Sequence, residues 1–202
     1  IELMENMLME KGPYRVQSIP LELRLPHPKN QIAYVIRVQF PYHREAICRL
    51  KVEISVDEPV LLKPESRLIL HDYDEDFKAF TKAYQLPEIV TEKYRALIQI
   101  LERLRAKGWG ANRVCRDYYD LWWILSKVKI DITNIPSLLK KKCAVKGVTY
   151  TNPEIFFDNA LIEVAQKEWE KLLIPFIGEQ ISLAEVLTDL RFFTMDLFSK
   201  AK

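Results

Sequence analysis

The sequence predicts an α+β protein in which a mostly antiparallel, strand-rich region is followed by a bundle of helices. Two observations lead to this prediction. β-type runs bounded by turn residues fill the first part of the chain, and apolar residues at helical spacing fill most of the rest. We therefore expect a strand-rich region at residues 1–85 and a helical domain at residues 86–202. The hydrophobic content of 49% is sufficient for a core in each.

The strand-rich region opens with a short helix over residues 1–10, which Gly12 and Pro13 end. Four β-type runs follow, at residues 14–25, 32–40, 46–56 and 68–70. Turn-forming residues separate these runs, so consecutive runs are expected to pair as an antiparallel meander.

The helical domain begins with an apolar periodicity from Leu86 to Leu104. A glycine-rich loop then leads to a second helix, for which Asn112 is the expected N-cap. A short basic helix is expected to open at Pro136.

Two more helices complete the expected bundle of four or five. One is expected to open at Asn152-Pro153 and to run to about Leu173. Ser182 and Glu185 form a capping box for the last helix.

Charged side chains interrupt the apolar pattern of the first two long helices. Lys93 occupies the buried stripe of one helix and Asp117 that of the next, where a charge is costly unless it is paired or used. Two compatible interpretations stay open: an ion pair joins the helices, or both helices line a polar cleft. Arg116 and Asp120 are four residues apart and are expected to pair on the helix surface.

A second charged pair lies in the strand Lys51-Val-Glu-Ile-Ser55, where Lys51 and Glu53 share one face. A strand carboxylate of this kind contributes to magnesium sites in phosphoryl-transfer enzymes, and a nearby lysine can neutralise a triphosphate. The alternative is an outward-facing pair on an antiparallel sheet, and the pattern alone does not separate the two.

The acidic run Asp72-Tyr-Asp74-Glu-Asp76 has the form of a metal-binding Asp-x-Asp motif. In a nucleotide-transfer site, a Gly-Ser or Gly-Gly turn precedes that motif by about ten residues and holds phosphates on its amides. None of the five glycines precedes the run at that spacing. We interpret it as a solvated acidic turn.

Composition limits the compartment and the partners. No segment contains the roughly 18 consecutive apolar residues that a membrane span needs, so we expect no membrane partner. The three cysteines are odd in number and lack CxxC spacing, which is typical of reduced thiols in a cytoplasmic protein. The net charge of +2 does not by itself indicate nucleic-acid binding.

Four segments together resemble the AbiEii/AbiGii toxin family of DNA-polymerase-β-like nucleotidyltransferases. They are Arg49–Ser55, Glu58–Leu62, Leu86–Leu97 and Arg116–Leu125, and the resemblance covers residues 1 to about 125. It implies that the strand-rich region is an incomplete nucleotidyltransferase core. It also implies a magnesium-dependent enzyme that transfers a nucleotide from an NTP to an RNA acceptor such as tRNA. Such a protein is the toxin of a toxin–antitoxin pair that acts in abortive infection, with an antitoxin protein as its partner.

The resemblance also implies roles for individual residues. Glu53 matches the strand carboxylate of the metal site, and Lys51 matches a lysine near the nucleotide phosphates. The late helical motif, implied to hold nucleotide or to support the site, matches Arg116, Asp117 and Asp120. Lys93 belongs to the same neighbourhood.

One family motif does not occur in the 202 residues. The glycine turn followed by Asp-x-Asp, expected ahead of residue 1, supplies the phosphate cradle and two metal carboxylates. Glu53 alone is too little to balance two magnesium ions and a triphosphate. We therefore expect no nucleotidyl transfer by this chain, either as a shortened product or as a non-catalytic relative.

The alternative function is a non-catalytic module that binds RNA or an acidic antitoxin through basic side chains. The candidate residues are Arg95, Arg103, Arg105, Lys107, Arg113 and the run Lys140-Lys-Lys142.

Overall fold

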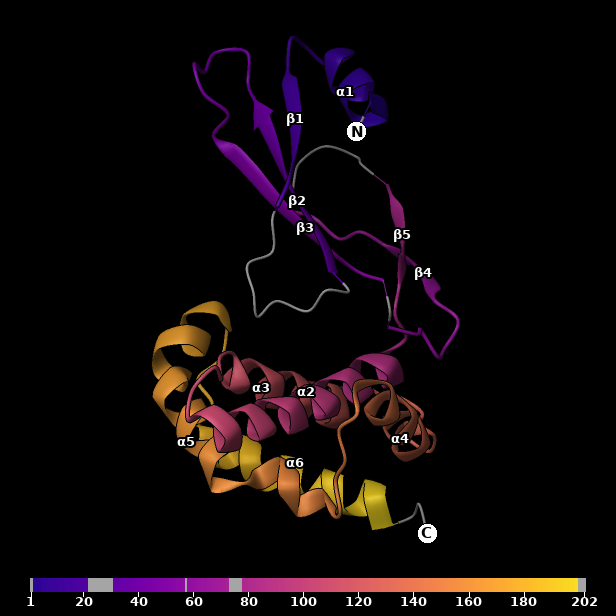
Figure 1. Ribbon diagram of the computed structural model, residues 1–202, viewed down its shortest axis with the longest axis vertical. Coiled ribbons are helices and arrows are strands. Elements are labelled where there is room, and N and C mark those ends of the chain that lie inside the picture. The colour runs from indigo at the N-terminus through magenta and orange to yellow at the C-terminus, as the bar shows by residue number, and fades with distance from the viewer. Residues whose placement is uncertain (1, 22–30, 57, 73–77, 200–202) are drawn as a thin grey trace. The chain divides into compact units, whose positions relative to one another are not determined.

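The computed structural model describes residues 2–21, 31–56, 58–72 and 78–199 (Figure 1). Contacts divide the chain into two compact units, Ile1–Glu58 and Pro59–Lys202. A small antiparallel sheet in the N-terminal part precedes the helices, as the α+β prediction requires. Strands give way to long helices at Leu86, while a domain boundary at residue 85 stays a prediction.

The first unit contains one helix and a three-stranded antiparallel sheet. Its elements are α1 (Glu2–Met9), β1 (Arg15–Pro20), β2 (Gln31–Gln39) and β3 (Cys48–Ser55). The strand order β1-β2-β3 confirms the expected meander. In this register Lys51 lies opposite Val35, and Glu53 lies opposite the buried Ala33.

The second unit opens with a short two-stranded antiparallel sheet, β4 (Glu65–Leu68) and β5 (Phe80–Ala83). A strand was expected at residues 68–70, whereas β4 ends at Leu68. β5 was not expected at all, because its sequence, Phe-Thr-Lys-Ala, mixes polar and apolar residues without a clear period. All but the first residue of the acidic run, residues 73–76, lies outside the described part of the chain.

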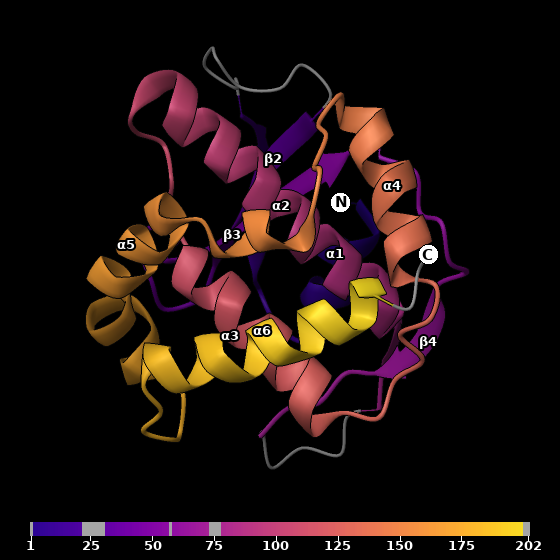
Figure 2. The same cartoon turned by 90° about the horizontal axis from the view of Figure 1, so that it is seen from below.

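Five α-helices and three shorter helical segments make up the rest of the described part of the second unit. The α-helices are α2 (Leu86–Lys107), α3 (Val114–Lys127), α4 (Ile135–Lys146), α5 (Asn159–Glu168) and α6 (Leu183–Ser199). The shorter segments are the 3-10 helices η1 (Pro153–Phe157) and η3 (Ile174–Phe176) and the π-helix η2 (Trp169–Leu173). The helices share one apolar core, in which Tyr94, Tyr118 and Phe156 are among the largest fully buried side chains. Figure 2 shows α6 beside α3, and these two helices contact each other.

The single helix expected from Asn152-Pro153 to Leu173 is wrong, because the chain breaks at Asp158. Asp158 has an extended ψ of 138°, and its carboxylate accepts a hydrogen bond of 2.9 Å from the N–H of Ala160. Aspartate readily makes such local bonds, which compete with helix continuation. The residue therefore caps α5 instead of lying inside a longer helix.

The two predicted caps have different outcomes. Asn112 is not the N-cap of α3, since Arg113 occupies that position with a left-handed φ of 65°. The capping box of α6 is confirmed: Glu185 N donates to Ser182 Oγ, and Ser182 N donates to Glu185 Oε2 at 3.0 Å.

None of the helices in the described part of the chain combines the length and apolar character that crossing a lipid bilayer requires.

Candidate functional site

A cluster of three charged side chains joins α2 to α3. Lys93 Nζ lies 2.9 Å from Asp117 Oδ1 and 2.6 Å from Asp120 Oδ2. The two aspartates are three residues apart on α3, so both carboxylates face the same lysine of α2. The predicted ion pair between Lys93 and Asp117 is confirmed, and Asp120 is an additional member of it.

The cluster is partly buried and carries a net charge of −1. The side chains of Lys93, Asp117 and Asp120 are 22%, 16% and 45% exposed. Burial lowers the pKa of Lys93, but the two carboxylates outweigh burial and raise its pKa above the ordinary value. Burial raises the pKa of Asp117, partly offset by Lys93. The lysine is therefore a cation at neutral pH, and these contacts use only two of its three N–H donors.

Arg116 points to a different partner from the one expected. Its Nη2 donates to the carbonyl of Leu172 at 3.4 Å, and its guanidinium lies 5.5 Å from the ring centroid of Phe176. The expected Arg116–Asp120 pair is wrong, because within the described contacts Asp120 is paired with Lys93 instead. No sequence pattern indicated Phe176, which follows α5 in a segment without a recognisable motif.

The first turn of α3 is held by a carboxylate from α5. Glu168 accepts hydrogen bonds from Arg113 N at 3.0 Å and from Cys115 N at 3.3 Å. These N–H groups lie at the helix N-terminus, where a negative charge is stabilising. The contact fixes the end of α3 that carries Asp117. Burial and the nearby Glu168 raise the pKa of Cys115 to about 11, so its thiol is protonated at neutral pH.

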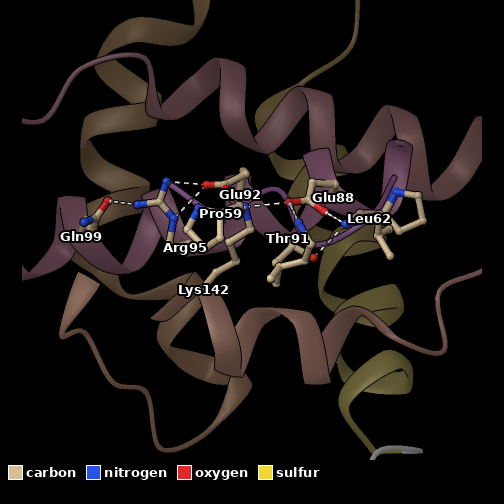
Figure 3. A network of polar contacts seen from close by, with 10 residues as sticks. Pro59, Leu62, Glu88, Thr91, Glu92, Arg95, Gln99 and Lys142 are labelled. Carbon is tan, nitrogen blue, oxygen red and sulfur yellow. Dashed lines mark hydrogen bonds and ion pairs between the residues drawn. The ribbon is translucent and has the colours of Figure 1, made fainter. Parts of the chain in front are cut away.

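Another face of α2 carries a buried ionic network (Figure 3). Lys142 of α4 is 3% exposed, and its Nζ lies 2.7 Å from Glu88, 2.6 Å from Glu92 and 2.6 Å from the carbonyl of Pro59. Arg95 pairs with Glu92 as well. The network fixes α2 against α4, which secures the helix that carries Lys93.

Glu88 links the same network to the segment that precedes β4. This carboxylate is 1% exposed and accepts the N–H groups of Leu61 and Leu62 at 3.0 and 2.8 Å. Arg95 and Lys142, expected as part of a basic surface, are therefore buried ion-pair partners. The expectation fails for these two residues because composition shows that they are basic, whereas only the packing of the helices shows that they are buried.

The buried carboxylate of Glu88 predicts a pH dependence of stability. Burial raises its pKa, but Lys142 and the two backbone N–H groups outweigh burial and lower it below the usual 4.5. A lowered folded pKa gives stability that is present above pH 4.5 and is lost as the pH falls through the folded value. We expect the difference in free energy of unfolding between the wild type and Glu88→Gln to shrink below about pH 4.5. Urea titrations at a series of pH values measure it, and a difference independent of pH contradicts the prediction.

The strand residues Lys51 and Glu53 form an ion pair of 2.8 Å on one face of β3. Their side chains are 55% and 45% exposed, as an outward-facing pair requires. Their roles near a metal ion and nucleotide phosphates stay predictions, as do those of Lys93, Arg116, Asp117 and Asp120. Within the described residues, no group of three His, Cys, Asp or Glu side chains is arranged to hold a metal ion. The predicted site residues therefore do not include a complete set of magnesium ligands within the described part of the chain.

A protein-family model matches most of the chain, residues 10–189. The model is described as "Nucleotidyl transferase AbiEii toxin, Type IV TA system". The match includes the β3 pair and the α2–α3 cluster, and it extends past residue 125 through α4 and α5 into α6. A search of curated proteins finds no match.

Proposed function

The chain belongs to the AbiEii nucleotidyl transferase toxin family of type IV toxin–antitoxin systems, and from this premise we propose that its α2–α3 cluster binds the phosphates of an NTP. The observation that carries the proposal is the lysine shared by two aspartates. Asp117 and Asp120 hold the Lys93 ammonium in place and keep it charged. Its third N–H donor remains for a phosphate oxygen.

In this proposal magnesium arrives as the counter-ion of the NTP. Asp120, whose side chain is 45% exposed, is the carboxylate of the cluster best placed to face the ion or its water ligands. For the first unit by itself, we propose Glu53 as a metal carboxylate and Lys51 as a lysine for nucleotide phosphates. Within the part of the chain that the structure describes, no group of three His, Cys, Asp or Glu side chains could hold the ion without further ligands.

An RNA acceptor is supported by the charge between residues 103 and 116. This segment contains five Lys or Arg residues and no Asp or Glu, although the whole chain has a net charge of only +2. Trp109 lies in the middle of the segment, 67% exposed, with Lys107 Nζ 5.7 Å from its ring centroid. Cations beside an exposed indole suit single-stranded RNA, such as the end of a tRNA. Arg105 already pairs with Asp158, so the remaining cations carry this proposal.

The same surface supports the second candidate function, a cytoplasmic module that binds RNA or an acidic antitoxin without catalysis.

The 202 residues contain no Gly-Gly or Gly-Ser turn that could hold phosphates ahead of an Asp-x-Asp motif. We therefore infer that these residues bind an NTP but do not transfer it by themselves.

The test combines equilibrium binding with a transfer assay. The chain is titrated with each of the four NTPs in the presence and absence of magnesium, and is separately incubated with labelled NTP, magnesium and tRNA. We expect magnesium-dependent NTP binding and no label on the RNA. Label on the RNA contradicts the inferred inactivity, and failure to bind any NTP contradicts the proposed site. RNA affinity that falls steeply with salt supports the acceptor surface, whereas absent or salt-independent binding removes it.

A further inference from the structure

We infer that the ring of Phe176 is a stacking platform for the base of the nucleotide whose phosphates bind at Lys93. This inference rests on the proposed function and adds the subsite for the nucleobase. The ligand class is a planar heteroaromatic base, presented by an NTP.

The first observation is that Phe176 is a large apolar side chain held on the surface. It is 76% exposed and ends the short 3-10 helix Ile174–Phe176. The Arg116 guanidinium lies 5.5 Å from its ring centroid, a cation–π distance. A guanidinium over part of the ring orients it, and most of the remaining ring surface stays open to a ligand.

The second observation is that the segment around Phe176 is tied to α3 on both sides. Before the phenylalanine, the carbonyl of Leu172 accepts a hydrogen bond from Arg116 at 3.4 Å. After it, Glu179 Oε1 accepts a 2.9 Å hydrogen bond from the Tyr119 hydroxyl. A surface ring between two such attachments is preorganised, so a ligand loses less free energy in ordering it.

The third observation is that Arg116, which contacts the platform, lies on the same helix as the two aspartates of the cluster. Arg116 directly precedes Asp117 and lies one helical turn before Asp120, so Arg116 and Asp120 are neighbours on the surface of α3. Arg116 therefore connects the phenylalanine ring, which it contacts, with the turn of α3 that carries the two carboxylates holding Lys93. An NTP has the same order of parts, with a flat base at one end and phosphates at the other.

Stacking also explains why an aromatic ring suits this position better than a polar side chain. Every base has a π face, so a protein ring stabilises any of them by stacking, with little selectivity. Phe176 then sets affinity for nucleotides as a class, while the edge of the base determines any preference among them.

The test compares a ligand that has a base with one that has only phosphates. ATP and inorganic tripolyphosphate are each titrated, with magnesium, into the wild type, Phe176→Ala, Phe176→Trp and Phe192→Ala. Phe192 is a matched control, because it is 71% exposed on α6 and has an edge-to-face contact with Phe193. Urea unfolding of each variant confirms that the fold is retained.

We expect Phe176→Ala to weaken ATP binding about tenfold or more and to leave tripolyphosphate binding unchanged. Phe176→Trp should bind ATP about as tightly as the wild type, because it keeps an aromatic ring. Phe192→Ala should change the affinity for neither ligand. If Phe176→Ala binds ATP as tightly as the wild type, the inference about the base is wrong, whereas the proposed binding of phosphates at Lys93 is unaffected. An equal loss for ATP and tripolyphosphate shows that Phe176 only supports the structure, which also overturns the inference. A wild type that binds neither ligand overturns the proposed function, and the inference with it.

Discussion

Replacing Lys93 with methionine is expected to weaken NTP binding by about ten- to a hundredfold. A hydrogen bond to a charged group contributes about 1.5–3 kcal/mol, and this lysine offers such a bond to the phosphates. The two aspartates that remain add repulsion, because the cluster changes from a net charge of −1 to −2. Calorimetric titration of magnesium-NTP into the wild type and the variant measures the effect.

The control must separate lost binding from lost stability. Lys93→Met leaves Asp117, only 16% exposed, without its cation, so the fold is expected to weaken as well. Combining Lys93→Met with Asp117→Asn removes both charges and should recover stability without recovering affinity. Lys127→Met, an exposed lysine at the other end of α3, should leave affinity unchanged. If folded Lys93→Met binds NTP normally, the cluster is only a tie between helices.

Replacing Lys142 with methionine is expected to lower the free energy of unfolding by about 3–5 kcal/mol. The change removes the buried cation that neutralises Glu88 and Glu92, and it leaves the carbonyl of Pro59 without this donor. An uncompensated buried carboxylate is costly because it has lost both water and its partner. Urea denaturation followed by circular dichroism gives the change directly.

The neighbouring lysine provides a matched control for this experiment. Lys141 lies next to Lys142 on the same helix but is exposed, so Lys141→Met should change stability by no more than about 0.5 kcal/mol. Adding Glu88→Gln to Lys142→Met removes one of the stranded charges and should recover part of the loss. A Lys142→Met protein as stable as Lys141→Met would show that the network contributes nothing to stability.

Much of the fold follows from local sequence signals. Turn residues between the early strands were enough to predict the meander, because short polar connections favour antiparallel neighbours. The contact between Lys93 and Asp117 was also predictable, since each charge interrupts an apolar stripe and each needs a partner. Local reasoning failed at Asp158, where a side-chain cap outweighed the apolar pattern that continues beyond it.

The candidate site was only partly predictable, because several of its contacts depend on tertiary structure. The four-residue spacing of Arg116 and Asp120 favours a pair on an isolated helix, but packing gives each a partner from another element. Phe176 was not predictable, since a single phenylalanine in a three-residue 3-10 helix has no period. Lys142 shares its sequence context with Lys140 and Lys141, and only the packing of α4 against α2 distinguishes it.

The short stretch between Glu168 and Phe176 has a consequence for how this protein can diverge. Both ends of that stretch touch the opening turn of α3, one through a carboxylate on backbone amides and the other through a ring against Arg116. Residues inside it can be exchanged, provided that the distance spanned stays the same. An insertion or deletion there would pull one attachment away from the other. In related chains, the length of this stretch should therefore drift far less than its composition.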